Sequence, residues 1–533
     1  MQGGDLMKAL RNVILLLSFV FLIGLFCSPE KTGAQVNFTG PELLCRPTGS
    51  SVTVNVVADA ALEAYFVYDT VSHDSGLLEE YSGTTDLITS TADEPVKAVI
   101  DALLPNTRYF YRMVYRESGG GDWVAGEEHS FHTQRAPGST FTFTIISDSH
   151  MNGGGGSVSA YEQTLGNIND DDDPPDFHFD LGDTFWMDGV TNSATANQRY
   201  LAQRQWMGAV SHSSAIFLAT GNHENEEGWN FDDANSKALL SINARKRYYP
   251  NPISDGFYSG NDDSLEAIEG DHLREDYYAW EWGDALFVVI DPYHYTMKFP
   301  YDAFVGGEDN DESLHTHDRW DWTLGEKQFK WLKKTLEYSS ARFKLVFAHH
   351  MLGGLEDYVR GGAAAAYLFE WGGYDIDGTT WGFDTERPGW GGVPIHQLMV
   401  ANGVSAFFYG HDHLYAYQMR DGVVYQEVPS AGLTGQGLQG YYNDPFTLEL
   451  LPSPGHLRIS VSPSQATVEY VQTAGGVMAH SYDILPTPYL YGDYWPADCD
   501  VDGSDLAMCI ANGAPAGRDI VAFAGSFGKT VCQ

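Results

Sequence analysis

Apolar runs alternate with helical patterns between residues 140 and 475, and this alternation constrains the fold more than any other feature. Residues 326–338 place Phe329, Leu332 and Leu336 on one helical face, and 394–403 begins with Pro and ends with Gly, as helices often do. The apolar runs lie at 141–147, 177–181, 215–219, 285–290, 343–348 and 404–409. Runs of this kind are typical of strands covered on both faces, so the sequence predicts an α/β domain.

Five of these runs end in polar residues of the types that bind metals. The residues that follow them are Asp148 and His150; Asp183; Asn222 and His223; His349 and His350; and His411, Asp412 and His413. The carboxyl ends of strands meet at one edge of an α/β sheet, so these side chains are expected to converge. The alternative is a set of solvated loop residues, but so many ionisable groups at strand ends need partners. The pattern therefore predicts a metal site.

With these five blocks in place, residues 140–475 resemble the calcineurin-like metallophosphoesterase family. The resemblance implies an αββα fold, in which two sheets are flanked by helices, and a pair of divalent metals. By position, Asp148, His150 and His413 match the ligands of one metal, Asn222, His349 and His411 match those of the other, and Asp183 matches the bridging ligand. His349 is preferred over His350 because it directly follows the apolar run, which is the family's ligand position.

The same resemblance implies a reaction. Two metals, Mn, Fe or Zn, would stand about 3.5–4 Å apart, and a metal-bound water would become hydroxide near neutral pH and attack phosphorus. His223 matches the family's catalytic histidine, which protonates the leaving oxygen or stabilises the charge of the transition state. The alternative role for His223 is to orient Asp148.

One position departs from a related group. Purple acid phosphatases also place a fibronectin-like domain before this catalytic fold, but they carry a tyrosinate ligand three residues after the bridging aspartate. Trp186 occupies that position here, and an indole cannot ligate a metal in this way. Purple acid phosphatases also lack the histidine that His150 provides. We therefore expect a colourless enzyme with Mn, Fe(II) or Zn.

The N-terminal residues 1–34 have the pattern of a secretory signal peptide. Lys8 and Arg11 precede an apolar run at 13–26, and small residues follow at 32–34. An uncleaved anchor is the alternative. We expect a secreted, periplasmic or cell-surface protein without a membrane span in the mature chain. Export permits disulfides, but the pairing of Cys45, Cys499, Cys509 and Cys532 stays open.

Residues 41–135 have the pattern of an all-β sandwich. Short alternating runs recur at a spacing of roughly ten residues and are separated by Gly, Pro and Asn. The stretches LLPNTRYFYR and SFHT resemble the fibronectin type III-like domain that often precedes a phosphatase domain. Any other β-sandwich spacer is the alternative. The catalytic domain is predicted to follow at 140–482.

The C-terminal residues divide into a Pro- and Tyr-rich linker at 483–497 and a small helical segment at 498–533. That segment resembles a dockerin-like module, because Asp498, Asp500, Asp502 and Gly503 match an EF-hand-type calcium loop. Asp505 falls at position 8 of that loop and Cys509 at position 12, so the match is partial. It implies bound calcium and a surface or cohesin-like partner. The alternative is an acidic tail.

Two arginines are candidates for binding the substrate phosphate. Arg360 and Arg387 lie in a Gly-rich insertion at 353–393, where a guanidinium could grip a phosphate. Structural arginines in a surface loop are the alternative. The chain carries 72 acidic and 30 basic residues, a net charge of −42, which argues against binding of a nucleic-acid polymer by a basic patch.

These features predict an exported phosphoesterase with two metals that hydrolyses small phosphorylated substrates, monoesters in preference. A phosphodiesterase or nucleotide pyrophosphatase is the first alternative. The second is a calcium-dependent surface attachment protein without catalysis. The third is a domain that only binds phosphorylated glycans or nucleotides.

Overall fold

The structure is a computed structural model, and it describes residues 36–73, 76–169, 173–231, 236–298, 318–354, 361–435, 437–438 and 444–486. The predicted signal peptide, most of the predicted linker and the predicted calcium segment lie outside these residues. No helix of the described part is long and apolar enough to cross a membrane. Cys45 is buried and carries a free thiol, whereas the other cysteines lie outside the described part.

Two large sheets form the centre of the molecule. The nine-stranded sheet runs in the order β22 (Val477–Ile484), β21 (Ala466–Gln472), β20 (Gly455–Val461), β9 (Phe141–Ile146), β10 (Phe177–Asp180), β11 (Ala215–Leu218), β1 (Leu43–Cys45), β2 (Val52–Val57) and β6 (Pro95–Ile100). The eight-stranded sheet runs in the order β12 (Ser259–Gly260), β13 (Tyr278–Trp282), β14 (Ala285–Val289), β15 (Phe343–Phe347), β16 (Ala406–Tyr409), β18 (Val423–Glu427), β17 (Leu414–Arg420) and β19 (Thr447–Pro452). All six predicted strands are present, and within each sheet they pair in parallel.

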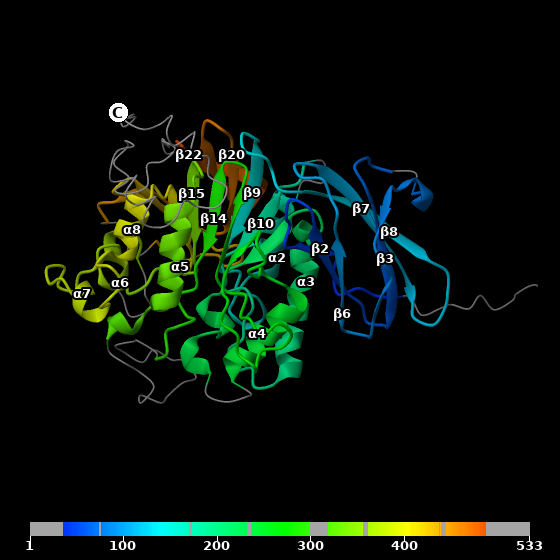
Figure 1. Cartoon of the computed structure of the whole chain (residues 1–533), viewed down its shortest axis with the longest axis horizontal. Coiled ribbons are helices and arrows are strands. Elements are labelled where there is room, and N and C mark those ends of the chain that lie inside the picture. The colour runs from blue at the N-terminus through cyan, green and yellow to red at the C-terminus, as the bar shows by residue number, and fades with distance from the viewer. Residues whose placement is uncertain are drawn as a thin grey trace, which may run out of the picture.

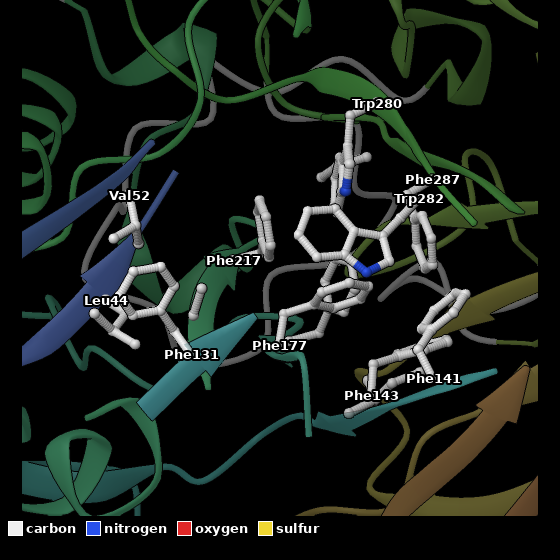
Figure 2. Close-up of a cluster of buried hydrophobic side chains, with 14 of the residues drawn as sticks. Leu44, Val52, Phe131, Phe141, Phe143, Phe177, Phe217, Trp280, Trp282 and Phe287 are labelled. Atoms are coloured by element: carbon white, nitrogen blue, oxygen red, sulfur yellow. The ribbon is translucent and has the colours of Figure 1, made fainter. Parts of the chain in front are cut away.

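The two sheets pack face to face on an aromatic core. Phe143, Phe177 and Phe217 from the first sheet meet Trp280 and Phe287 from the second (Figure 2). Phe177 and Phe287 contact edge to face with ring centroids 5.0 Å apart, a favourable geometry for aromatic rings. Along β9, β10 and β11, every second residue faces the second sheet, and the residues between them face outward.

Helices cover both outer faces. α2 (Val158–Ile168), α3 (Ser193–Ser211) and α4 (Lys237–Tyr248) share a buried cluster with the outward residues of the first sheet. α5 (Gly325–Tyr338) and α8 (Ile395–Ala401) do the same for the second sheet, with α6 (Phe369–Gly372) and α7 (Phe383–Glu386) nearby (Figure 1). This is the predicted arrangement of two mixed sheets between helices. Because both faces are covered, β10, β11 and β16 are buried at every residue.

The N-terminal strands do not form a separate sheet pair. A five-stranded sheet contains β4 (Gly83–Thr84), β3 (Leu62–Asp69), β7 (Arg108–Glu117), β8 (Val124–His132) and β5 (Ile88–Ser90). It packs against β2 and β6. These two strands belong to the nine-stranded sheet, because β1 pairs with β2 on one side and in parallel with β11 on the other. The predicted sandwich therefore shares one layer with the α/β part, and its likeness to a fibronectin type III domain stays a prediction.

A buried arginine reinforces this junction. Arg204 of α3 is fully buried and donates hydrogen bonds at 2.8 Å to the side chain and the carbonyl of Asn55 in β2. It also donates at 2.8 Å to the carbonyl of Tyr248 at the end of α4. Burial of a guanidinium is costly unless it is hydrogen-bonded, and the three bonds from Nη1 and Nη2 offset that cost and join β2 to the helical layer, whereas Nε has no partner among the described residues.

Two buried histidines make the fold sensitive to acid. His178 and His456 lie fully buried on β10 and β20, and burial lowers the pKa of each to about 3. Thr144 shares a hydrogen bond with Nδ1 of His178, whereas Nε2 of His178 and both nitrogens of His456 have no partner among the described residues. The unfolded chain binds protons below about pH 6.5, so stability falls as the pH falls below that value.

We expect each histidine to cost about 2 kcal/mol of unfolding free energy between pH 7.5 and pH 5. Urea unfolding of His456→Leu at both pH values should show a pH-dependent loss smaller by that amount, whatever the substitution does to packing. A loss as large as that of the unchanged protein would contradict the burial argument.

Candidate metal centre

Five strands deliver polar side chains to one edge of the two sheets. β9 leads to Asp148 and His150, β10 to Asp183, β11 to Asn222, β15 to His349, and β16 to His411 and His413. Of these residues, only Asn222 and His413 are not fully buried. The structure therefore brings together all seven residues predicted as metal ligands.

The first group consists of Asp148, His150, Asp183 and His413, and one ligand atom from each lies within 4.8 Å of the others. Nε2 of His150 is 3.6 Å from Oδ1 of Asp148 and 3.6 Å from Oδ2 of Asp183. Nε2 of His413 is 3.4 Å from Oδ1 of Asp148. These spacings are long for hydrogen bonds and suit atoms that each stand about 2 Å from a shared cation.

The second group consists of Asp183, His349 and His411. Nε2 of His349 lies 3.2 Å from Oδ2 of Asp183, 3.2 Å from Nδ1 of His411 and 3.2 Å from Oδ1 of Asn222. Asp183 belongs to both groups, which is the position required of a bridging carboxylate. Nδ1 of His349 faces the carbonyl of Leu181 at 3.0 Å, so Nε2 is the nitrogen that faces the group.

Two observations indicate that a cation fits here. Oδ1 of Asp148 and Nε2 of His150 are buried polar atoms without a hydrogen-bond partner among the described residues. Burial lowers the pKa of His349, but the carboxylates of Asp183 and Asp148 outweigh it and raise that pKa to about 10. The site thus combines strong negative potential, carboxylate oxygens and imidazole nitrogens, which suit Mn, Fe or Zn.

Backbone strain is concentrated at the same residues. Asp148, His150, Asp183, His411 and His413 have φ values of 52°, 52°, 56°, 79° and 60°. Residues other than glycine rarely adopt this left-handed backbone conformation, and each such residue costs roughly 1–3 kcal/mol of folding free energy. Gly410 adds a steric requirement, because a Cβ there would lie 2.0 Å from Oγ of Ser147 and 2.5 Å from Oδ2 of Asp148.

Glu224 ties the two loops that carry the bridging and amide ligands. Its Oε2 accepts hydrogen bonds from the N–H groups of Gly221 at 2.7 Å and Asp183 at 2.9 Å. Its Oε1 accepts from the N–H groups of Thr184 at 2.9 Å and Phe185 at 2.8 Å. The carboxylate is 2% exposed, so these bonds are shielded from water. We did not predict this role, although the acid directly follows His223 in the sequence.

His223 lies beside the first group. Nδ1 of its ring is 2.8 Å from Oδ2 of Asp188, and its backbone N–H donates to Oδ1 of Asp183 at 2.8 Å. Burial lowers the pKa of His223, but the Asp183 and Asp188 carboxylates raise it overall to about 9. The alternative role predicted for His223 was to orient Asp148, but no hydrogen bond joins these two residues in the described part of the chain. Asp188 was not predicted; its signal is an acid five residues after Asp183.

The remaining predicted residues fall into two sets. Arg360 and the calcium candidates Asp498, Asp500, Asp502 and Asp505 lie outside the described residues. Arg387 pairs with the buried carboxylate of Glu370 and donates to the carbonyls of Trp320 and Trp322. These contacts occupy its guanidinium and favour the structural alternative over phosphate binding.

His350 and a third acidic group do not extend the metal centre. His350 points into an aromatic cluster with Tyr293 and Trp322, and burial lowers its pKa to about 3. Asp276, Asp291 and His294 also lie within 4.8 Å of one another. However, Nε of Arg274 is 3.0 Å from Oδ2 of Asp276, and Nδ1 of His294 is 2.6 Å from the same oxygen. That group is therefore an ion-pair network in which the guanidinium of Arg274 supplies the positive charge.

Comparison with known proteins shows the fold. No protein-family model matches the sequence, and no curated protein matches it. A purple acid phosphatase, PPD1, from yellow lupin (Lupinus luteus) seeds is similar in structure over 84% of this chain and 74% of its own, with a TM-score of 0.53 and 15% identity. The structure of PhoD is similar over 84% of this chain and 89% of its own, with a TM-score of 0.51 and 16% identity. The predicted α/β architecture is thus shared with the structures of this purple acid phosphatase and of PhoD.

We expect Glu224→Gln to weaken metal binding about 10- to 100-fold, because half of the carboxylate becomes an amide donor that faces backbone donors. Titration of Mn(II) or Zn(II) followed by calorimetry measures this loss. Glu227→Gln is the matched control, since that buried carboxyl accepts a hydrogen bond from Asn230, whereas the N–H groups of Gly221, Asp183, Thr184 and Phe185 donate to Glu224. Equal metal affinities of Glu224→Gln and the unchanged protein would show that the two loops keep their arrangement without the Glu224 carboxylate.

Proposed function

We propose that the protein is a phosphoesterase that uses two divalent metals. The observation that carries the proposal is the convergence of the two groups on Asp183, with buried ligand atoms of Asp148 and His150 left unpartnered. The fold shared with a purple acid phosphatase supports it. Asp148, His150, Asp183 and His413 would hold one ion, and Asp183, Asn222, His349 and His411 the other.

Two divalent ions bound there would supply an activated water and a clamp for the attacking and leaving oxygens of an in-line displacement. The protein's own residues set the geometry around that clamp. Glu224 fixes the backbone of Asp183, and the carbonyl of Leu181 orients His349. The left-handed backbone at Asp148 and His411 aims their side chains into the centre.

His223 is placed to act as the general acid. Because Asp188 occupies Nδ1, Nε2 is the nitrogen available to a substrate. During hydrolysis the water gives up one proton to the solvent as its oxygen forms a bond to phosphorus, the bond from phosphorus to the ester oxygen breaks, and the proton on Nε2 passes to that leaving oxygen. The Asp188 carboxylate at Nδ1 favours the protonated ring, as this role requires.

Phosphate monoesters are the proposed substrates, by analogy with phosphatases of the same domain order. Two other outcomes are distinguishable. A preference for diesters would identify a phosphodiesterase or nucleotide pyrophosphatase. Metal and phosphate binding without turnover would favour a binding or attachment protein.

The test compares p-nitrophenyl phosphate with bis(p-nitrophenyl) phosphate after the metals are removed by a chelator and Mn, Fe(II) or Zn is restored in turn. We expect hydrolysis only with metal restored, a preference for the monoester, and loss of activity in His349→Ala. His272→Gln is the control, because His272 lies outside both groups. Hydrolysis that is unaffected by metal removal and by His349→Ala would refute the proposal.

We expect His223→Gln to lower kcat on alkyl monoesters about 100- to 10,000-fold, the range that a general acid contributes. The effect on metal affinity should be small, because His223 supplies no ligand atom to either group. Rates with glycerol 2-phosphate, measured beside a metal titration, check both points. An unchanged kcat would exclude His223 as the acid.

A further inference from the structure

Trp186 stands against the proposed general acid. Its indole stacks on the imidazole of His223 with ring centroids 3.8 Å apart and ring planes at 23°. The ring of His150 is farther away, at 5.4 Å and a tilt of 49°. The residue at the position of a tyrosinate ligand in purple acid phosphatases thus contacts the histidine that moves the proton.

The loop after His150 is shaped to receive this indole. A Cβ on Gly153 would lie 2.7 Å from Cδ1 of Trp186, and a Cβ on Gly154 would lie 2.4 Å from Cε3. These distances are shorter than any van der Waals contact, so a side chain at either position would displace the indole. Arg199 anchors the same loop by donating to the carbonyl of Asn152. The glycine-rich run is therefore complementary to the tryptophan.

His223 is consequently restrained in three ways. Asp188 holds Nδ1, Asp183 holds the backbone N–H, and Trp186 covers a face of the ring. The Asp183 bond holds the backbone and the Asp188 bond holds Nδ1, but a hydrogen bond stays favourable over a range of angles and so leaves the ring plane some freedom to tilt. The stacked indole restricts that tilt.

We infer that Trp186 is a positioning residue, which fixes the plane of the His223 ring so that Nε2 points at the leaving oxygen. The inference rests on the proposed function. Proton transfer requires hydrogen-bond reach and alignment, and a small misplacement of the donor reduces the rate strongly.

The test exploits how much each leaving group needs a proton. p-Nitrophenolate leaves without protonation, whereas the alkoxide from glycerol 2-phosphate must take the proton from Nε2 as its bond to phosphorus breaks. We expect Trp186→Ala to lower kcat on glycerol 2-phosphate about 10- to 100-fold, with a much smaller change on p-nitrophenyl phosphate and an unchanged KM for both. Trp186→Phe should recover most of the rate, because it keeps an aromatic face.

A double substitution separates positioning from general damage. In a His223→Gln background, Trp186→Ala should cause no further loss on glycerol 2-phosphate, since the group that it positions is gone. Trp123→Ala is the matched control, because that indole is half-exposed beside Arg116 on the five-stranded sheet. It should leave both rates unchanged.

Equal losses on the two esters, or a full loss that persists in the His223→Gln background, would overturn the inference while the proposed function stands. Absence of hydrolysis by the unchanged protein with any metal would overturn the proposed function first, and the inference with it. The two failures are therefore distinguishable in one set of assays.

Discussion

A single buried carboxylate organises the candidate metal centre. Glu224 accepts four backbone N–H groups from the loops that follow β10 and β11. The loops carry Asp183, Asn222 and His223, which are the proposed bridging ligand, amide ligand and general acid, so one side chain positions three residues of the proposed site. Burial and the Asp183 carboxylate raise the pKa of Glu224 to about 7, whereas its backbone hydrogen bonds favour the ionised form, and at 2% exposure little water competes for them.

Metal binding and folding are coupled in such a site. The left-handed backbone at Asp148, His150, Asp183, His411 and His413 is unfavourable by itself, and so are unpartnered buried polar atoms. The aromatic core and the hydrogen bonds around the site hold this arrangement. A bound cation would offset part of the cost, because binding energy to a site that exists only in the folded chain is also folding energy. The charge pattern points the same way, since carboxylates dominate the potential felt by His349.

The sequence was informative wherever a buried strand ended in a short loop. The six apolar runs are typical of strands covered on both faces, and the carboxyl ends of parallel strands share one edge. The convergence of Asp148, Asp183, Asn222, His349 and His411 could therefore be predicted without coordinates. The roles of Glu224 and Trp186 could not, because they depend on which backbone and which ring each side chain meets across the loops. Arg387 is a residue whose role the sequence left open. Its glycine-rich surroundings were compatible with phosphate binding or with a structural role, and only the structure shows that it pairs with Glu370. The pairing of β1 with β11 was equally hidden, because a strand of three residues carries no mark of its partner.

That pairing gives the N-terminal segment a protective role. Without the residues before 140, β11 would become the border of its sheet and would present unpaired N–H and C=O groups to solvent. The apolar side chains that now pack against β2 would be exposed as well. Borders of this kind recruit strands from other molecules and lead to aggregation. The segment from β1 to β6 continues the sheet by three strands and carries that border away from the parallel strands that bear the site. The N-terminal strands thus cover the border of β11 against pairing with strands of other molecules.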